Sequence, residues 1–212
     1  MFYNEFHAEL QNVKTCDQTL REYFPDYEYK GVFFDVGAFD PIIISNSYHF
    51  EKNGWRTFCF EANTELIPEL KKYRKNVFNY AIAECDKDSV TFNVVMSGGW
   101  SAGFSAINID QRYIEKWGGI SSQSTITVPQ KCLNSLINDE IKDIEHIDIL
   151  SIDVEGGELN VLKGLDINKY KPTIILVEDV FDDRELIDYI VDYGYILDQS
   201  ISYNKYFVRK NL

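Results

Sequence analysis

The sequence lacks the features that mark several large classes of protein. Lysine and arginine number 21 against 34 acidic residues, a net charge of −13. This balance argues against electrostatic binding of DNA or RNA, which needs a basic surface. No run approaches the roughly 18 apolar residues of a membrane span. The N-terminal MFYNEFHAELQ has no basic segment followed by an apolar one, as a signal peptide requires. We therefore expect no nucleic-acid partner and no membrane association.

Cysteine is scarce and scattered. The four cysteines contain no Cys-x-x-Cys pair and lie far apart in the chain, at Cys16, Cys59, Cys85 and Cys132. This spacing fits neither a zinc site nor a disulfide framework. Unpaired cysteines are typical of a reducing compartment. We therefore expect a cytoplasmic protein, or one in the cytoplasm of a host cell if the chain is viral.

Short apolar runs rich in β-forming residues alternate with segments of helical period. A chain of 212 residues, 45% of them hydrophobic, can form one α/β domain with its own core. The patterns predict strands at 31–37, 56–62, 76–83, within 146–158 and at 172–179. They predict helices at 5–24 (ended by Pro25), 43–53, 64–74, 158–164 and 183–193. Thr64 is a suitable N-cap for the helix over 64–74.

Other segments predict antiparallel structure. Residues 89–97 alternate apolar and polar side chains, which suits an antiparallel excursion. The predicted elements that follow are a Gly/Ser-rich loop at 97–108, a short helix over 108–117, and a strand and helix within 124–139, broken at Pro129. Strands at 195–200 and 204–209 flank a short turn at Tyr203-Asn204. They predict a terminal hairpin that inserts one antiparallel strand into the sheet.

Repeated strand-then-helix order predicts a parallel sheet with helices on both faces. We place an N-terminal helical extension at 1–29 and the main domain at 30–212, which together form one globular domain. Open sheets of this kind bind ligands beyond the carboxyl ends of their strands, where the strand order reverses. The residues that follow each predicted strand are therefore the candidates for a site.

Polar and small residues follow every predicted strand. They are Asp35 and Gly37 after the first, Glu61 after the second, Asn79, Tyr80 and Ala81 after the third, Asp153 and Glu155 after the fourth, and Glu178 and Asp179 after the fifth. Gly37 lets the backbone approach a ligand closely. Glu61 can accept hydrogen bonds from a ribose diol, and the residues after the third strand can flank an adenine. Asp153 ends an apolar run, where a carboxylate is costly unless it is paired or functional.

The loop after the first strand indicates which nucleotide fits. A dinucleotide site uses G-x-G-x-x-G, because a pyrophosphate must lie against the backbone. The loop here, Gly37 to Pro41, has no second or third glycine, and Phe39 would obstruct a pyrophosphate. S-adenosylmethionine carries no phosphate and needs only one tight turn and a ribose-binding acid. It therefore fits better than a dinucleotide, and a dinucleotide-dependent oxidoreductase is the weaker alternative.

Three segments carry a family resemblance. They are FFDVGAFDPIIISNSYHFEKNGWRTFCFEANTELIPELKK at 33–72, YAIAECD at 80–86 and IDILSIDVEGGELNVLKGL at 147–165. Together they resemble the FkbM family of methyltransferases, over roughly residues 30–180. Ser151 stands where family members usually have lysine, and Ala62 where proline is commoner. The lysine difference puts in doubt any role for that position but leaves the expected fold unchanged.

The resemblance implies a Rossmann-like class I methyltransferase fold, with a mostly parallel seven-stranded sheet whose last strand is antiparallel. It implies S-adenosylmethionine as the methyl donor. The implied contacts are the methionine part for Asp35, Gly37, Ser45 and Asn46, the ribose for Glu61, the adenine border for Ala62, Asn63 and Ala81, and the sulfonium and acceptor for Asp153 and Glu155. Family members mostly O-methylate hydroxyl groups, often on sugars or natural products.

Methyl transfer to a hydroxyl needs a base, because an alcohol is a poor nucleophile. The candidates are Asp153, Glu155 and His49, with Asp153 preferred because it ends a central strand beside the cofactor site. The alternative is a divalent ion held by Asp153, Glu155 and Asp179, which would acidify a sugar diol. We prefer the mechanism without a metal.

The acceptor is expected to be a small molecule or glycan. Trp100 and Phe104, in the Gly/Ser-rich loop, suit stacking on a sugar face, although they can equally pack the loop onto the core. Glu178 and Asp179 are placed on the acceptor side. Two alternatives stay open: an N- or carboxyl-methyltransferase that acts on a protein, and a catalytically silent binding domain of the same fold. The sequence does not indicate the oligomeric state.

Overall fold

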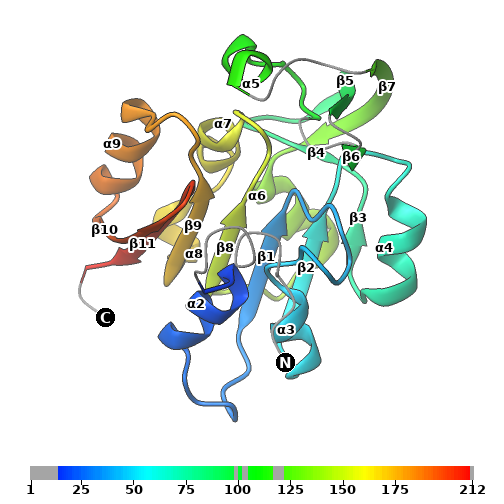
Figure 1. The fold of residues 1–212 in the computed structure, drawn as a ribbon. Coiled ribbons are helices and arrows are strands. Elements are labelled where there is room, and N and C mark those ends of the chain that lie inside the picture. The colour runs from blue at the N-terminus through cyan, green and yellow to red at the C-terminus, as the bar shows by residue number, and fades with distance from the viewer. Residues whose placement is uncertain (1–13, 98–99, 102–104, 117–121, 211–212) are drawn as a thin grey trace.

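A seven-stranded sheet forms the centre of the molecule (Figure 1). The computed structural model describes residues 14–97, 100–101, 105–116 and 122–210. The strands of the large sheet are β1 (Val32–Val36), β2 (Arg56–Phe60), β3 (Val77–Phe78), β8 (Ile149–Ile152), β9 (Ile174–Glu178), β10 (Tyr195–Ile201) and β11 (Asn204–Arg209). Their order is β10-β11-β9-β8-β1-β2-β3.

Strand direction confirms the predicted Rossmann-like fold. β1 pairs in parallel with β2 and β8, β2 with β3, and β8 with β9. β11 lies between β9 and β10 and is antiparallel to both. The terminal hairpin therefore inserts one antiparallel strand into an otherwise parallel sheet, as predicted. The strand order reverses at β1, which places a ligand crevice at its carboxyl end.

Alternate residues of the central strands enter two cores, one on each face of the sheet. Phe34 and Leu150 belong to the larger core, whereas Phe33 and Ile149, their neighbours in the chain, belong to the smaller one. Burial on both faces explains why these strands read as continuous apolar runs. On the smaller core lie α2 (Cys16–Tyr23) and α3 (Tyr48–Lys52), which cover one face of the sheet (Figure 1).

The helices of the larger core lie on the opposite face of the sheet. The larger core takes residues from α6 (Leu133–Leu136), the π-helix η1 (Ile137–Ile141), α7 (Glu158–Lys163), α8 (Ile167–Tyr170) and α9 (Arg184–Asp192). The remaining two are α4 (Ile67–Tyr73), which packs on β2, and α5 (Gln111–Lys116). Among the described residues, no helix has the length and apolarity needed to cross a membrane.

Several helix boundaries differ from the prediction. The helix expected over 43–53 begins only at Tyr48, and the one expected over 64–74 begins at Ile67. Thr64 is therefore not its N-cap. Asn63 begins the turn at 64–66 that precedes the helix, and its side-chain oxygen accepts a hydrogen bond from the Glu65 N–H at 3.1 Å. Of the helix predicted over 5–24, residues 16–23 are confirmed with Thr15 as the cap, and residues 5–13 lie outside the described part.

A second, four-stranded sheet was not predicted as such. Its strands are β4 (Ala81–Ile82), β5 (Lys87–Ser97), β6 (Trp100–Ser101) and β7 (Ser122–Lys131), in the order β4-β7-β5-β6. β5 confirms the antiparallel excursion at 89–97. The single strand predicted over 76–83 was wrong, because residues 77–78 join the large sheet and residues 81–82 the small one. The break at Pro129 was also wrong: β7 continues through it beside a shift in the β5–β7 register, where a missing N–H is tolerated.

Candidate active site

A cavity of about 600 Å³ lies at the carboxyl ends of the central parallel strands. The second sheet supplies its far wall through residues such as Ala81 and Phe92. The predicted site residues that line it are Asp35, Gly37, Asn46, Glu61, Ala62, Asn63, Ala81, Asp153, Glu155 and Glu178. The fold thus brings together residues that are up to 143 positions apart in the chain, from Asp35 to Glu178. This volume is in the range of small-molecule sites.

Four predicted residues that the structure describes do not line the cavity. One is Asn79, whose side-chain amide donates to the Glu61 and Ala62 carbonyls at 2.9 and 3.1 Å. Ser45 is buried beside Arg74, and Asp179 forms an ion pair with Lys205 at 3.0 Å. His49 is buried on α3, with its ring edge-on to those of Tyr27 and Phe50. Ser45, Asp179 and His49 were expected to contact ligand directly, and their placement does not provide that contact.

The two aromatic residues expected at the acceptor wall differ in what the structure describes. Trp100 lies in β6, which pairs with the end of β5, but its side chain is outside the described part. Phe104 lies outside the described residues altogether. Their stacking on a sugar therefore stays a prediction.

Gly37 lies where the carboxyl ends of β1, β2 and β8 meet. Its φ is +86°, and a Cβ atom built there would lie 1.7 Å from the backbone oxygen of Asp153. The Gly37 N–H donates to the Phe60 carbonyl at 2.9 Å, and the Asp153 N–H donates to the Val36 carbonyl at 2.9 Å. Only glycine fits this conformation and this approach. Gly37 is thus required first by backbone packing, and that packing fixes where Asp153 enters the cavity.

The Glu61 carboxylate is held by backbone donors. Its Oε2 accepts from the Phe39 N–H at 3.0 Å, and its Oε1 accepts from the Asn63 N–H at 2.7 Å. Each carboxylate oxygen can accept a second hydrogen bond, so the group can still bind a diol from the cavity. Burial raises the pKa of Glu61 to about 7. The backbone hydrogen bonds lower this pKa, but by less than burial raises it.

Four further carboxyl groups gather at the ends of β8 and β9. One oxygen each from Asp153, Glu155 and Glu178 lies within 4.8 Å of the other two. Glu158, which sequence reasoning did not single out, accepts from the Val154 and Gly156 N–H groups at 3.1 Å and so shapes the loop. Burial raises the pKa of Asp153 to about 6 and that of Glu158 to about 7. Burial and then mutual repulsion raise those of Glu155 and Glu178 well above the ordinary range.

This geometry agrees with a comparison to known families. The sequence model of the Methyltransferase FkbM domain matches residues 35–197, more than half of the chain. The chain belongs to the FkbM methyltransferase family. The match begins at Asp35 and includes Glu61, Asp153 and Glu178. No curated protein and no solved structure matched the chain.

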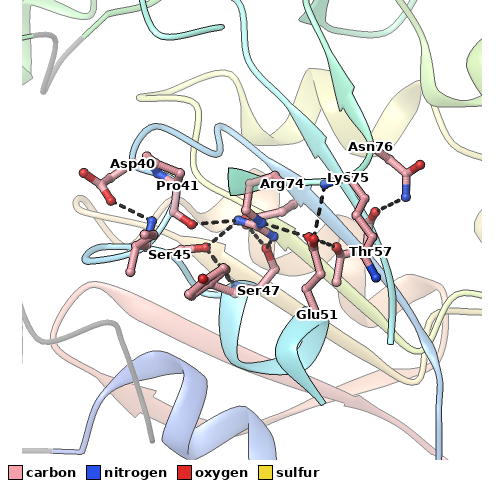
Figure 2. Close-up of polar contacts among 12 residues, drawn as sticks. Asp40, Pro41, Ser45, Ser47, Glu51, Thr57, Arg74, Lys75 and Asn76 are labelled. Carbon is pink, nitrogen blue, oxygen red and sulfur yellow. Dashed lines mark hydrogen bonds and ion pairs between the residues drawn. The ribbon is translucent and has the colours of Figure 1, made fainter. Parts of the chain in front are cut away.

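A buried arginine supports the loop between β1 and α3 of this FkbM domain (Figure 2). Arg74 follows α4, and its side chain is fully buried. Its Nε donates to Glu51 Oε2 at 2.9 Å, its Nη1 to Ser45 Oγ at 2.9 Å and its Nη2 to Ser47 Oγ at 2.5 Å. Ser47 Oγ in turn donates to the Asp35 carboxylate. Arg74 therefore positions Asp35 without lining the cavity.

Sequence reasoning missed Arg74. Arg74 follows a helix whose other charged side chains face water, so nothing near it in the sequence sets it apart. Its serine partners lie 27 and 29 positions earlier in the chain. Burial raises the pKa of Asp35, and the charge of Arg74 limits that rise. The loop from β1 to α3 thus depends on one cation from a distant element.

Replacing Arg74 with methionine should destabilise the FkbM domain strongly. Breaking a buried ion pair leaves an uncompensated charge, here Glu51, at a cost of about 3–5 kcal/mol. The matched control is Arg184→Met, whose ion pair with Asp188 at 3.6 Å is exposed and worth about 0.5 kcal/mol or less. Urea unfolding of both variants measures the difference. Equal, small losses would contradict the supporting role of Arg74.

The acidic cavity should make the ligand-free protein more stable at about pH 5 than at about pH 8. The pKa values of Asp153, Glu61 and Glu158 are raised in the folded state, to about 6, 7 and 7. Their contribution is therefore complete below the unfolded value of about 4 and is lost as the pH rises through about 6–7. Thermal unfolding across this range measures the slope.

Acid also stabilises any strongly acidic protein by reducing charge repulsion over its whole surface. Two variants separate that general effect from the effect of the buried carboxyl groups. Glu178→Gln removes one carboxyl group from the cavity, so its melting temperature should depend less on pH than that of the wild type. Glu185→Gln removes an equal charge from a side chain that is 74% exposed, and it should keep the wild-type slope. If both variants show the wild-type slope, the buried carboxyl groups do not cause it.

Proposed function

We propose that this FkbM domain uses S-adenosylmethionine to methylate a hydroxyl group of a sugar or related small molecule. The observation that carries the proposal is Glu61, which lines the cavity at the end of β2 with its carboxylate oriented by two backbone N–H groups. A carboxylate so placed suits the two hydroxyls of a ribose. The β1 loop has no phosphate-binding glycines, which favours this cofactor over a dinucleotide.

The rest of the cavity fits the donor. Ala62 and Asn63 lie beside Glu61, and Ala81 and Phe92 form an apolar wall that suits an adenine. Asp35 and Asn46 line the cavity near Gly37, where a carboxylate and an amide suit an amino acid group. When bound, the cofactor supplies a methyl group on a positively charged sulfur. The acidic end of the cavity, at Asp153, is electrostatically suited to that charge.

Asp153 is the residue that we expect to take the proton of the acceptor hydroxyl. It lines the cavity, and Gly37 fixes its backbone. A base works best when its pKa lies near the working pH, and burial raises that of Asp153 to about 6. His49 has no part in this step because it lies outside the cavity lining. Glu155 and Glu178 lie next to Asp153 and line the acceptor side of the cavity.

Transfer of a labelled methyl group tests the proposal. The protein is incubated with methyl-labelled S-adenosylmethionine and a panel of nucleotide sugars, free glycans, amines and proteins. We expect label on a hydroxyl of a sugar or glycan. Label on an amine or a protein carboxyl group alone would show that the acceptor class is wrong. Absence of S-adenosylhomocysteine binding would contradict the donor assignment itself.

A further inference from the structure

Three carboxylates from two neighbouring strands face one point of the cavity. Asp153 and Glu155 follow β8, and Glu178 ends β9. One oxygen atom of each lies within 4.8 Å of the other two, and all three residues line the cavity. Within the part of the chain that the structure describes, no lysine, arginine or histidine forms an ion pair with any of them. The described residues therefore supply no cation to this cluster.

Glu155 shows that the cluster is incomplete without a ligand. Its Oε2 atom is buried and has no hydrogen-bond partner. Two other acidic side chains of the cavity differ: Glu61 accepts from two backbone N–H groups, and Asp35 accepts from Ser47. Glu158, which lies outside the cavity lining, also accepts from two backbone N–H groups. A buried carboxylate oxygen without a donor is costly. That cost is removed if the oxygen coordinates a cation.

We propose that Asp153, Glu155 and Glu178 bind a divalent cation of the Mg²⁺ or Mn²⁺ class. The cluster offers oxygen atoms only, and carboxylate oxygens select hard cations over zinc or copper. Three carboxylates carry more charge than one divalent ion neutralises, so the bound ion keeps the site attractive to the donor's sulfonium. Glu178 takes the place that the sequence suggested for Asp179, whose carboxylate is bound to Lys205 instead.

The cation would recognise the acceptor, an inference that rests on the proposed function. Mg²⁺ usually binds one or a few protein carboxylates and completes its coordination with water or substrate oxygens. A cavity-facing ion can therefore hold two neighbouring hydroxyls of a sugar. A coordinated hydroxyl loses its proton more readily. Its O–H bond would then break, with the electron pair left on the hydroxyl oxygen and the proton passed to Asp153. The acceptor class is therefore a vicinal diol.

Titration with Mn²⁺, followed by electron paramagnetic resonance, tests the site without any acceptor. The full chain is first treated with a chelator and then transferred to chelator-free buffer. We expect one Mn²⁺ per chain in the wild type. Glu155→Gln and Glu178→Gln keep the side-chain shape but remove a charged ligand, and each should weaken binding by about tenfold or more. Glu185→Gln, on the exposed face of α9, is the control and should bind as the wild type does.

Each outcome decides the proposal. Absence of Mn²⁺ binding by the wild type overturns it, and so does binding that survives unchanged in both glutamine variants. Melting temperatures report whether the variants fold, and Asp153→Asn gives a third isosteric variant if one does not. Titration of the same samples with S-adenosylhomocysteine separates the two proposals. If the protein binds S-adenosylhomocysteine but not Mn²⁺, the metal site is wrong and the proposed function stands. If it binds Mn²⁺ but not S-adenosylhomocysteine, the donor assignment is wrong and the metal site stands.

Discussion

Gly37→Ala should abolish both binding of the cofactor and methyl transfer. A β-carbon at this position would lie 1.7 Å from the Asp153 carbonyl oxygen, a backbone atom that cannot rotate away. The ends of β1 and β8 must therefore separate, which displaces Asp35, Glu61 and Asp153 relative to one another. The expected cost is about 1–2 kcal/mol for the left-handed conformation, plus about 1–3 kcal/mol for the overpacked contact.

Gly194→Ala is the matched control for Gly37→Ala. Its φ is also +86°, but nothing lies within 4 Å of a β-carbon built there. It should therefore lose only the conformational term of about 1–2 kcal/mol and keep full activity. Thermal unfolding and titration with S-adenosylhomocysteine measure both variants. If Gly37→Ala binds S-adenosylhomocysteine as tightly as Gly194→Ala does, the β1 loop does not form the cofactor site.

Asp153→Asn should abolish methyl transfer and leave cofactor binding largely intact. The variant keeps the shape of the side chain but cannot accept the proton of the acceptor hydroxyl. Loss of a general base lowers the turnover rate by about 10²–10⁴-fold. Because burial raises the pKa of Asp153, removing the charge should also stabilise the fold slightly at neutral pH. Lost activity together with retained or increased stability separates this effect from unfolding.

Asp166→Asn is the control for Asp153→Asn. Asp166 is exposed and caps α8 by accepting the Lys169 N–H at 3.0 Å, and asparagine caps a helix equally well. This variant should keep wild-type turnover. Single-turnover rates with a labelled donor compare the two variants directly. Wild-type turnover by Asp153→Asn would refute the assignment of Asp153.

The sequence indicates residues that line the cavity where polar side chains lie at the ends of apolar runs. Asp35 is the next-to-last residue of β1, and Glu61 and Asp153 directly follow β2 and β8. These strands are mostly buried, so a polar residue in such a position stands out. Parallel strands then bring these ends to one edge of the sheet. The alternation of strands and helices predicts a parallel sheet with a terminal hairpin, and the family resemblance implies its seven strands.

The sequence does not show in which direction a side chain points or which distant residue it contacts. Glu178 and Asp179 are adjacent, yet Glu178 faces the cavity and Asp179 faces Lys205, because successive residues of an extended chain point to opposite sides. Arg74 reaches Asp35 only through Ser47, and no local pattern links them. The second sheet was missed because the paired residues of β5 and β7 lie 26 to 43 positions apart in the chain, where local periodicity carries no information.

Calorimetric titration of the purified protein with S-adenosylhomocysteine tests the central claim most directly. The claim is that the cavity at Glu61 and Gly37 holds the donor. It predicts one product molecule bound per chain, with affinity reduced about tenfold or more in Glu61→Gln because two charge-assisted hydrogen bonds to the ribose are weakened. The affinity should be unchanged in Glu65→Gln, whose side chain lies outside the cavity lining. No binding by the wild type, or equal affinity in Glu61→Gln and Glu65→Gln, would contradict the claim.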